Sequence, residues 1–256
     1  MIDSRPDAKT LAYINLYGIL GTLENLLELD PDARALLHNK KPITVAFDVK
    51  GGPKASITFA YGFCRMKDRI DECDIKLPFS SCEKFNGMID GTVTPIPSKG
   101  FTHLGFLLKD FQDLTDRLTK YLRPDPKDLE DKKFFDISTS LMLYLIGVAI
   151  AQIGNNDEVG RFSASYIADG SILLGVKDGP AATIYCKNHR LLTLKKRTDD
   201  PRAFMEFDSI ELARDLFDGK VNAVASIGTG LIRIGGLISM VDNVNRILDR
   251  VGLYLA

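Results

Sequence analysis

The sequence has few of the residues that build metal centres, disulfide frameworks or charged binding surfaces. Its 256 residues include three histidines and four cysteines, and the formal net charge is −1. The cysteines at 64, 73, 82 and 186 form no Cys-x-x-Cys pair, and no histidine has a cysteine or carboxylate at metal-ligand spacing. We therefore expect no metal and no cofactor, and thiols that stay reduced, as in the cytoplasm.

The near-neutral charge also limits the partners. A chain without net positive charge lacks the electrostatic footprint of proteins that bind nucleic acid or an anionic membrane surface. Residues 1–7 have neither the basic start nor the apolar core of a signal peptide. We expect a cytoplasmic protein without a nucleic-acid partner. The sequence identifies no protein partner.

Motifs of the common catalytic sites are missing as well. The chain has no phosphate-binding P-loop and no Gly-x-Ser-x-Gly turn, and Gly228-Thr229-Gly230 lacks the third glycine of a dinucleotide fingerprint. Asp90 and Asp218 resemble residues at helix ends rather than a pair of catalytic carboxylates. We predict no catalytic residues and a protein that is not an enzyme.

What the sequence does contain is a long internal repeat. Val49-Lys50-Gly51-Gly52-Pro53 recurs as Val176-Lys177-Asp178-Gly179-Pro180, 127 residues later. Ser80-x-x-Glu83 and Asp208-x-x-Glu211, 128 apart, match the capping box that begins a helix. Gly100 to Gly105 aligns with Gly230 to Gly235 at a shift of 130. A period of this length is that of a small domain, so we predict two tandem domains at 1–128 and 129–256.

Apolar spacing and turn residues predict the same order of elements in both halves. In the first half, we predict helices at 11–36, 81–90 and 106–122 and strands at 43–49, 55–61, 74–79 and 101–104, with 62–73 irregular and a linker at 123–133. In the second half, we predict helices at 135–153, 209–218 and 237–255, a helical turn at 221–227, and strands at 172–177, 182–187, 191–196, 204–207 and 231–234.

Three stretches of the second half are distinctive: Val176-Lys177-Asp178-Gly179-Pro180, Leu216-Phe217-Asp218-Gly219-Lys220, and the run from Gly230 to Gly236. In this order they resemble the sterol carrier protein-2 (SCP2) family. The first half matches more loosely, with Val49 to Pro53 and Met88-Ile89-Asp90-Gly91. The resemblance implies an α+β fold of two tandem SCP2-like domains. Each would have a mixed or antiparallel sheet of about five strands covered by helices.

The resemblance also implies an apolar tunnel between sheet and helices that takes a fatty acid, acyl-CoA or sterol-like molecule. The function it implies is non-enzymatic lipid binding and transport. The side chains expected to line the tunnel are Leu104, Leu107, Leu108, Phe111 and Leu114 in the first half, and Leu231, Ile234, Leu237, Ile238, Val241, Val244, Ile247 and Leu248 in the second.

Besides an enzyme that uses the fold as an accessory domain, two alternatives remain open at this point. A scaffold or interaction protein that kept the fold but filled the cavity would show the same apolar stripes, and Phe101, Phe106 and Phe111 are bulky enough to fill the first half. The second alternative concerns the uncharged stretch 137–156, which has the marginal length of a transmembrane helix. We interpret it instead as a covered helix between the domains and expect no stable membrane insertion.

Overall fold

The computed structural model describes residues 5–38 and 40–255, which form two compact units. The N-terminal unit is Asp7–Ile137; the C-terminal unit is Ser138–Ala256, together with Arg5 and Pro6. The division lies inside one long helix, nine residues beyond the expected domain boundary. Residues 1–4, on which part of the signal-peptide expectation rests, lie outside the described residues.

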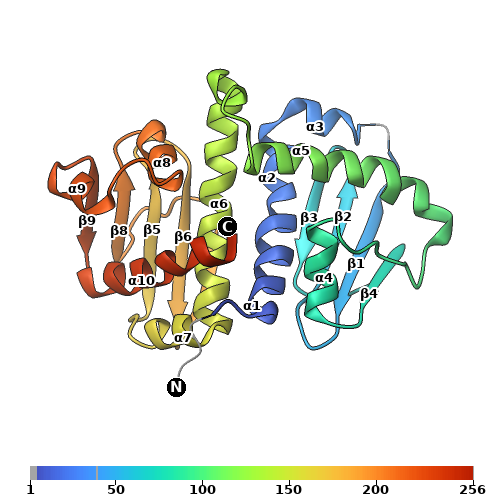
Figure 1. Cartoon of the computed structure of the whole chain (residues 1–256), viewed down its shortest axis with the longest axis horizontal. Coiled ribbons are helices and arrows are strands. Elements are labelled where there is room, and N and C mark those ends of the chain that lie inside the picture. Colours follow the sequence, from blue (N-terminus) through green and yellow to red (C-terminus); the bar gives the residue numbers. More distant parts are fainter. Residues whose placement is uncertain (1–4, 39, 256) are drawn as a thin grey trace. The chain divides into compact units, whose positions relative to one another are not determined.

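The N-terminal unit begins with a helical segment and continues into a four-stranded mixed sheet with strand order β3-β2-β1-β4 (Figure 1). The helical elements of the segment are α1 (Ala8–Tyr13), a π-helical stretch (Ile14–Ile19), a 3-10 turn (Leu20–Thr22), α2 (Leu23–Leu29) and α3 (Pro31–Ala35). The strands are β1 (Ile43–Val49), β2 (Lys54–Ala60), β3 (Phe63–Lys67) and β4 (Ile75–Phe79). The remaining elements are α4 (Cys82–Ile89), a 3-10 turn (Phe101–His103), a π-helical stretch (Phe106–Phe111), α5 (Gln112–Leu122) and a 3-10 turn (Asp128–Glu130).

The C-terminal unit has a five-stranded mixed sheet with strand order β7-β6-β5-β8-β9, and α10 contacts β8 and β9 (Figure 1). Its strands are β5 (Gly170–Val176), β6 (Ala181–Lys187), β7 (Arg190–Leu194), β8 (Ala203–Phe207) and β9 (Ile232–Gly236). Its helices are α6 (Lys132–Asn156, shared with the N-terminal unit), α7 (Glu158–Ala164), α8 (Ile210–Phe217), α9 (Ala223–Gly228) and α10 (Ile238–Leu255). The α+β fold class expected from the sequence is confirmed.

The two units repeat one topology and one strand register. Ile43 pairs with Phe59 in the first hairpin and Gly170 pairs with Cys186 in the second, so both partners are offset by 127 residues. The first strand of each unit also pairs in parallel with the fourth, β1 with β4 and β5 with β8. The register therefore establishes which residues of the two units correspond.

Both units place a capped helix after the parallel strand, with the cap one residue later than expected. Ser81 caps α4 by accepting from the Lys84 amide, and Ser209 Oγ accepts from the Leu212 amide at 3.1 Å to cap α8. The predicted capping boxes at Ser80 and Asp208 are therefore wrong by one position. Each helix ends at an aspartate followed by a glycine with positive φ, Gly91 and Gly219. Such a glycine closes a helix without steric cost.

The sheets differ at one edge, where two prolines replace a cross-strand pair. In the C-terminal unit Glu206 lies opposite Arg233, and the side chains form an ion pair at 2.6 Å. The corresponding residues in the N-terminal unit are Pro78 and Pro97, which have no amide hydrogen to donate to a ladder. Only an isolated bridge between Lys76 and Lys99 remains there. The expectation of about five strands thus holds for one unit, and the other has four.

The geometry at this sheet edge shows that the sequence alignment of Gly100 with Gly230 is wrong. A Cβ on Gly100 would lie 2.3 Å from the carbonyl oxygen of Asp74, and one on Gly236 would lie 2.2 Å from that of Arg202. Both glycines have positive φ and approach the start of the parallel strand. Gly100 therefore corresponds to Gly236, not to Gly230, and the strand expected at 101–104 is a 3-10 turn.

Two further elements, α7 and β3, were missed. Residues 62–73, expected to be irregular, contain β3, which pairs antiparallel with β2 at the sheet edge. Its five residues are mostly exposed, and only Cys64 is buried. Its matching edge strand β7 has the same burial pattern and was predicted, because three of its five residues are leucines. β3 instead has Arg65 and Lys67 among its five residues, which hide the apolar signal.

The long apolar helix α6 packs against the C-terminal sheet. A Cβ on Gly147 would come within 2.8 Å of the Ala182 Cβ, and the Gly147 carbonyl accepts a hydrogen bond from Thr193 Oγ1 at 2.7 Å. By length and composition α6 could cross a membrane, with a mean hydropathy of 1.8 over 18 residues. However, 72% of that window is buried inside the protein, as in the core helix of a globular domain.

Candidate functional site

The last helical segment of each unit, which we call the closing segment, is 106–122 in the N-terminal unit and α10 in the C-terminal unit. The residues expected to line an apolar tunnel lie on the closing segments or beside them. In the C-terminal unit Val241, Val244 and Ile247 are buried on α10, and Ile234 and Leu248 are half-buried. Leu231, Leu237 and Ile238 are exposed at the two ends of β9, with Ile238 at 52%. The buried positions face the protein interior. The exposed ones leave apolar surface beside the strand that α10 covers.

In the N-terminal unit fewer of the predicted tunnel residues are buried. Leu114 is fully buried on α5, and Leu104, Leu107 and Phe111 are half-buried. Leu108 is 75% exposed. The π-helical stretch that carries Leu107, Leu108 and Phe111 turns more slowly than an α-helix, so spacing at three and four does not assign its buried face.

A cluster of phenylalanines fills the interior of the N-terminal unit. Phe106 lies 5.3 Å from Phe59, measured between ring centroids, and Phe111 lies 6.0 Å from Phe59 and 6.2 Å from Phe47. Phe85 on α4 contacts Phe47 and also Phe79, at 5.1 Å. Of the three residues named as bulky in the sequence, Phe106 and Phe111 join this cluster, and Phe101 is 60% exposed. The closing segment is therefore locked onto the sheet by aromatic packing.

The C-terminal unit has smaller side chains at the corresponding buried positions. The register matches Phe47 with Leu174 and Phe59 with Cys186, and the helix caps match Phe85 with Ala213. Phe79 alone is retained, as Phe207, whose ring contacts Phe217 at 6.0 Å. Three large aromatic side chains are thus replaced by a leucine, a cysteine and an alanine, all buried. This layer of the C-terminal unit carries much less side-chain volume at matched positions.

A second feature, absent from the sequence analysis, is a buried Asp–Arg–Tyr cluster that occurs in both units. In the N-terminal unit the carboxylate of Asp30 accepts hydrogen bonds from Arg117 Nε, from the Tyr121 hydroxyl at 3.1 Å and from the Asp32 amide at 3.0 Å. Asp30 caps α3, and Arg117 and Tyr121 lie one turn apart on α5. The cluster ties the closing helix to the end of the first helical segment.

The C-terminal copy uses Asp157, Arg250 and Tyr254. Asp157 Oδ2 accepts from Arg250 Nη2 at 2.6 Å and from the Tyr254 hydroxyl at 2.7 Å, and Oδ1 caps α7 by accepting from the Gly160 amide. A sequence signal was available, because Asp30 and Asp157 share the 127-residue shift and Arg-x-x-x-Tyr recurs 133 residues later. We missed it because the two shifts differ.

The electrostatics of both copies follow from burial and hydrogen bonding. Burial alone would raise the pKa of the Asp30 carboxyl, but hydrogen bonds from Arg117 and Tyr121 and the charge of Arg117 hold that pKa below its usual value. For Asp157, burial is likewise outweighed by hydrogen bonds from Arg250, Tyr254 and the Gly160 amide, so its pKa is also lowered. Burial, with the neighbouring charge of Asp30, raises the pKa of Tyr121 to about 12. Both carboxylates are therefore ionised near neutral pH.

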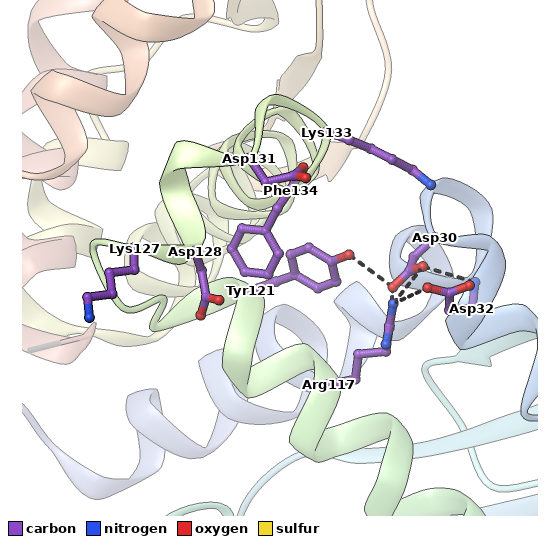
Figure 2. Close-up of a pocket in the computed structure, with 9 residues that line it drawn as sticks. All are labelled: Asp30, Asp32, Arg117, Tyr121, Lys127, Asp128, Asp131, Lys133 and Phe134. Carbon is purple, nitrogen blue, oxygen red and sulfur yellow. Dashed lines mark hydrogen bonds and ion pairs between the residues drawn. The ribbon is translucent and has the colours of Figure 1, made fainter.

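Around the N-terminal copy the structure leaves a pocket of about 330 Å³ (Figure 2). Part of its wall is a stacked pair of rings, Tyr121 and Phe134, with centroids 4.4 Å apart and planes 22° from parallel. The rest of its lining is charged and comprises Asp30, Asp32, Asp128, Asp131, Arg117, Lys127 and Lys133. All of these residues belong to the N-terminal unit, and the pocket is a polar site distinct from the apolar layer below the closing helices.

Residues of the usual metal and thiol chemistry are not gathered in the described part of the chain. No group of three or more histidine, cysteine or carboxylate side chains there is placed to hold a metal ion. Cys64, Cys82 and Cys186 are buried and Cys73 is half-buried, and all four are free thiols. Burial raises the thiol pKa of Cys82 and Cys186, which keeps them protonated and unreactive.

Comparisons with known proteins give likenesses in structure only. No protein-family model and no curated protein matches the chain. A UbiJ-SCP2 ubiquinone synthesis protein is 16% identical, covering 41% of this chain and 94% of its own, with a TM-score of 0.32. The sterol carrier protein domain 2 of Helicoverpa armigera is 17% identical, covering 43% and 87%, with a TM-score of 0.34.

A longer protein shows a weaker likeness. The sec-alkylsulfatase Pisa1 from Pseudomonas sp. is 11% identical to this chain, with a TM-score of 0.24, and covers 56% of this chain and 28% of its own. At such identities and scores the likeness to all three proteins carries no activity, substrate or ligand over to this chain.

Proposed function

We propose that the C-terminal unit binds an apolar small molecule, such as a lipid chain, between its sheet and α10, and that it does so without catalysis. The observation that supports this proposal is the replacement of Phe47, Phe59 and Phe85 by Leu174, Cys186 and Ala213 at matched buried positions. We infer that the volume freed by these replacements is available to a ligand.

Energetics make an apolar site sufficient for binding. Each methylene removed from water contributes about 0.8 kcal/mol, so a chain of about fifteen methylenes gains about 12 kcal/mol before the costs of association. No charged group is required for that gain. The exposed Leu237 and Ile238, at the start of α10, supply apolar surface over which such a chain would enter.

The N-terminal unit supports a different role. Its phenylalanine cluster occupies the corresponding layer, and its Phe106 and Phe111 come from the closing segment itself. We propose that the apolar layer of this unit is filled and that it takes up no lipid chain there. We also propose a cytoplasmic location, which the free thiols of all four cysteines support because such thiols persist in a reducing compartment.

Titration with a fluorescent fatty acid tests the assignment. Val241→Trp on α10 should lower uptake, because a large ring at this buried position would occupy the same layer. Ile238→Trp should impair uptake at the proposed entrance. Leu114→Trp, at a buried position of α5, is the matched control and should leave uptake unchanged if the protein stays folded by circular dichroism. Full uptake by both C-terminal variants would overturn the placement of the site.

A further inference from the structure

We propose that the charged pocket of the N-terminal unit binds a small organic anion that carries a planar ring. This proposal does not depend on the apolar site of the C-terminal unit, because the two sites belong to different units and share no residue.

The carboxylates in the pocket are already used by the protein. Asp30 accepts from Arg117, Tyr121 and the Asp32 amide, and Asp32 pairs with Arg117 Nη2 at 3.0 Å. Asp128 pairs with Lys120 at 3.0 Å outside the lining, and Asp131 accepts from the Phe134 amide at 2.8 Å. Each acidic side chain therefore has a donor within the unit, which reduces its attraction for a cationic ligand.

The two lysines that line the pocket, unlike its carboxylates, have side chains that are not paired among the described residues of the unit. Within the described part of the chain, the side-chain ammonium groups of Lys127 and Lys133 make no hydrogen bond or ion pair. Figure 2 shows the Lys133 side chain extending toward Asp30 and Asp32, with Lys127 at the other end of the group, beyond Asp128. The groups left to bind a ligand are thus ammonium donors, which suit carboxylate or phosphate oxygens.

The aromatic wall adds a requirement for shape. Tyr121 is 5% exposed and stacks on Phe134, and Lys120 Nζ lies over the Phe134 ring, 5.6 Å from its centroid. Phe134 is half-buried, so the aromatic surface left for a planar ligand ring is on Phe134. A pocket of about 330 Å³ is at the small end of the range for small-molecule sites.

Comparison with the C-terminal copy shows that the cluster does not need a pocket for its structural role. The Arg250 side chain is 9% exposed, whereas that of Arg117 is 34% exposed and reaches a second carboxylate, Asp32. The position of Asp32 corresponds to Val159 in the C-terminal unit. The N-terminal copy is thus more exposed to solvent and has one more carboxylate, that of Asp32. Residues 127–134 contribute two lysines and the Phe134 ring to the pocket beside it.

The test uses the full chain and three probes at the same concentrations: phenyl phosphate, inorganic phosphate and benzylammonium. We expect phenyl phosphate to bind most tightly and to shift the amide resonances of residues 127–134 in two-dimensional NMR spectra. Inorganic phosphate should bind more weakly, since it lacks the ring. Tighter binding of benzylammonium, or no shift in those amides at millimolar phenyl phosphate, would overturn the proposal.

Variants locate the site. Lys133→Ala and Lys127→Ala should each weaken phenyl phosphate binding about tenfold, as expected when one charge-assisted hydrogen bond is lost. Phe134→Leu should weaken phenyl phosphate but not inorganic phosphate. Lys177→Ala, an exposed lysine of the C-terminal unit, is the matched control and should bind as the unmodified protein does. Unchanged affinity in the Lys127→Ala, Lys133→Ala double variant would contradict the assignment.

Discussion

The two units of this protein share one strand order and register, yet they use the same positions differently. The N-terminal unit fills its interior with phenylalanines and leaves its Asp–Arg–Tyr cluster partly open to solvent. The C-terminal unit has smaller side chains in its interior and buries the corresponding cluster. A repeated fold therefore supports two different proposed sites, one apolar and one charged, and each unit lacks the features that support the other's.

The largest effect is expected from exchanging side chains between matched interior positions. Phe85→Ala should destabilise the N-terminal unit by about 3–5 kcal/mol, because it removes a fully buried ring from the cluster. Hydrogen exchange measured by mass spectrometry, which reports each unit separately, should show lost protection in residues 43–89. Protection in the C-terminal unit should be unchanged.

The reverse exchange sharpens the comparison. Ala213→Phe restores in the C-terminal unit the ring that the N-terminal unit has. If the freed volume is available, this variant should stay folded and lose apolar ligand uptake. A fully packed interior would instead be strained by about 1–3 kcal/mol, and a fall in stability of that size would argue against the cavity.

The second prediction compares the buried and open copies of the Asp–Arg–Tyr cluster. Asp157→Ala should cost about 3–5 kcal/mol, because it leaves the guanidinium of Arg250 buried without its partner. Asp30→Ala should cost less, about 1–3 kcal/mol, because Arg117 is one-third exposed and keeps Asp32. Denaturant titration of both variants measures the order, and a larger loss for Asp30→Ala would contradict the distinction.

The third prediction concerns the strand that only one sheet possesses. Arg233→Pro should release β9 from β8 at a cost of roughly 1–3 kcal/mol, since it removes an amide from the ladder and the ion pair to Glu206. Amides of residues 203–207 should then exchange faster. Arg233→Ala, which keeps the amide, is the control and should leave that exchange nearly unchanged.

The smallest effect expected near neutral pH is the pH dependence of the free energy of unfolding. The pKa values of Asp30 and Asp157 are lowered by folding, so their contribution to stability is complete above the unfolded pKa of about 4 and is lost as pH falls through the folded values. Thermal unfolding should therefore be independent of these groups from pH 5 to 8 and should become easier below pH 4. The Asp30→Asn, Asp157→Asn double variant should show a weaker acid dependence.

Much of this architecture could be read from the sequence, because the repeat places equivalent patterns at a constant spacing. Hairpins at Gly51 and Asp178 and helix ends at Gly91 and Gly219 depend on local turn chemistry, which sequence reports well. What failed depends on pairing at a distance. β3 has two charged residues among its five, and the N-terminal sheet as described ends at four strands because Pro78 and Pro97 lie opposite each other across an edge.

The candidate sites, too, could be predicted from the sequence only in part. Apolar stripes predict which helices close the units but not whether the layer beneath is filled, because that depends on the volumes of facing residues such as Phe59 and Cys186. The Asp–Arg–Tyr cluster joins residues about ninety positions apart, and neither end carries a motif on its own. Predicting it would have required matching two different shifts in the repeat.

Native mass spectrometry of the purified protein, followed by organic extraction of any bound molecule, tests the central claim most directly. The account predicts one apolar molecule per chain in the unmodified protein, retained in Phe85→Ala and absent from Ala213→Phe. A protein that stays free of ligand after incubation with fatty acid and acyl-CoA would contradict it and would make both units filled scaffolds.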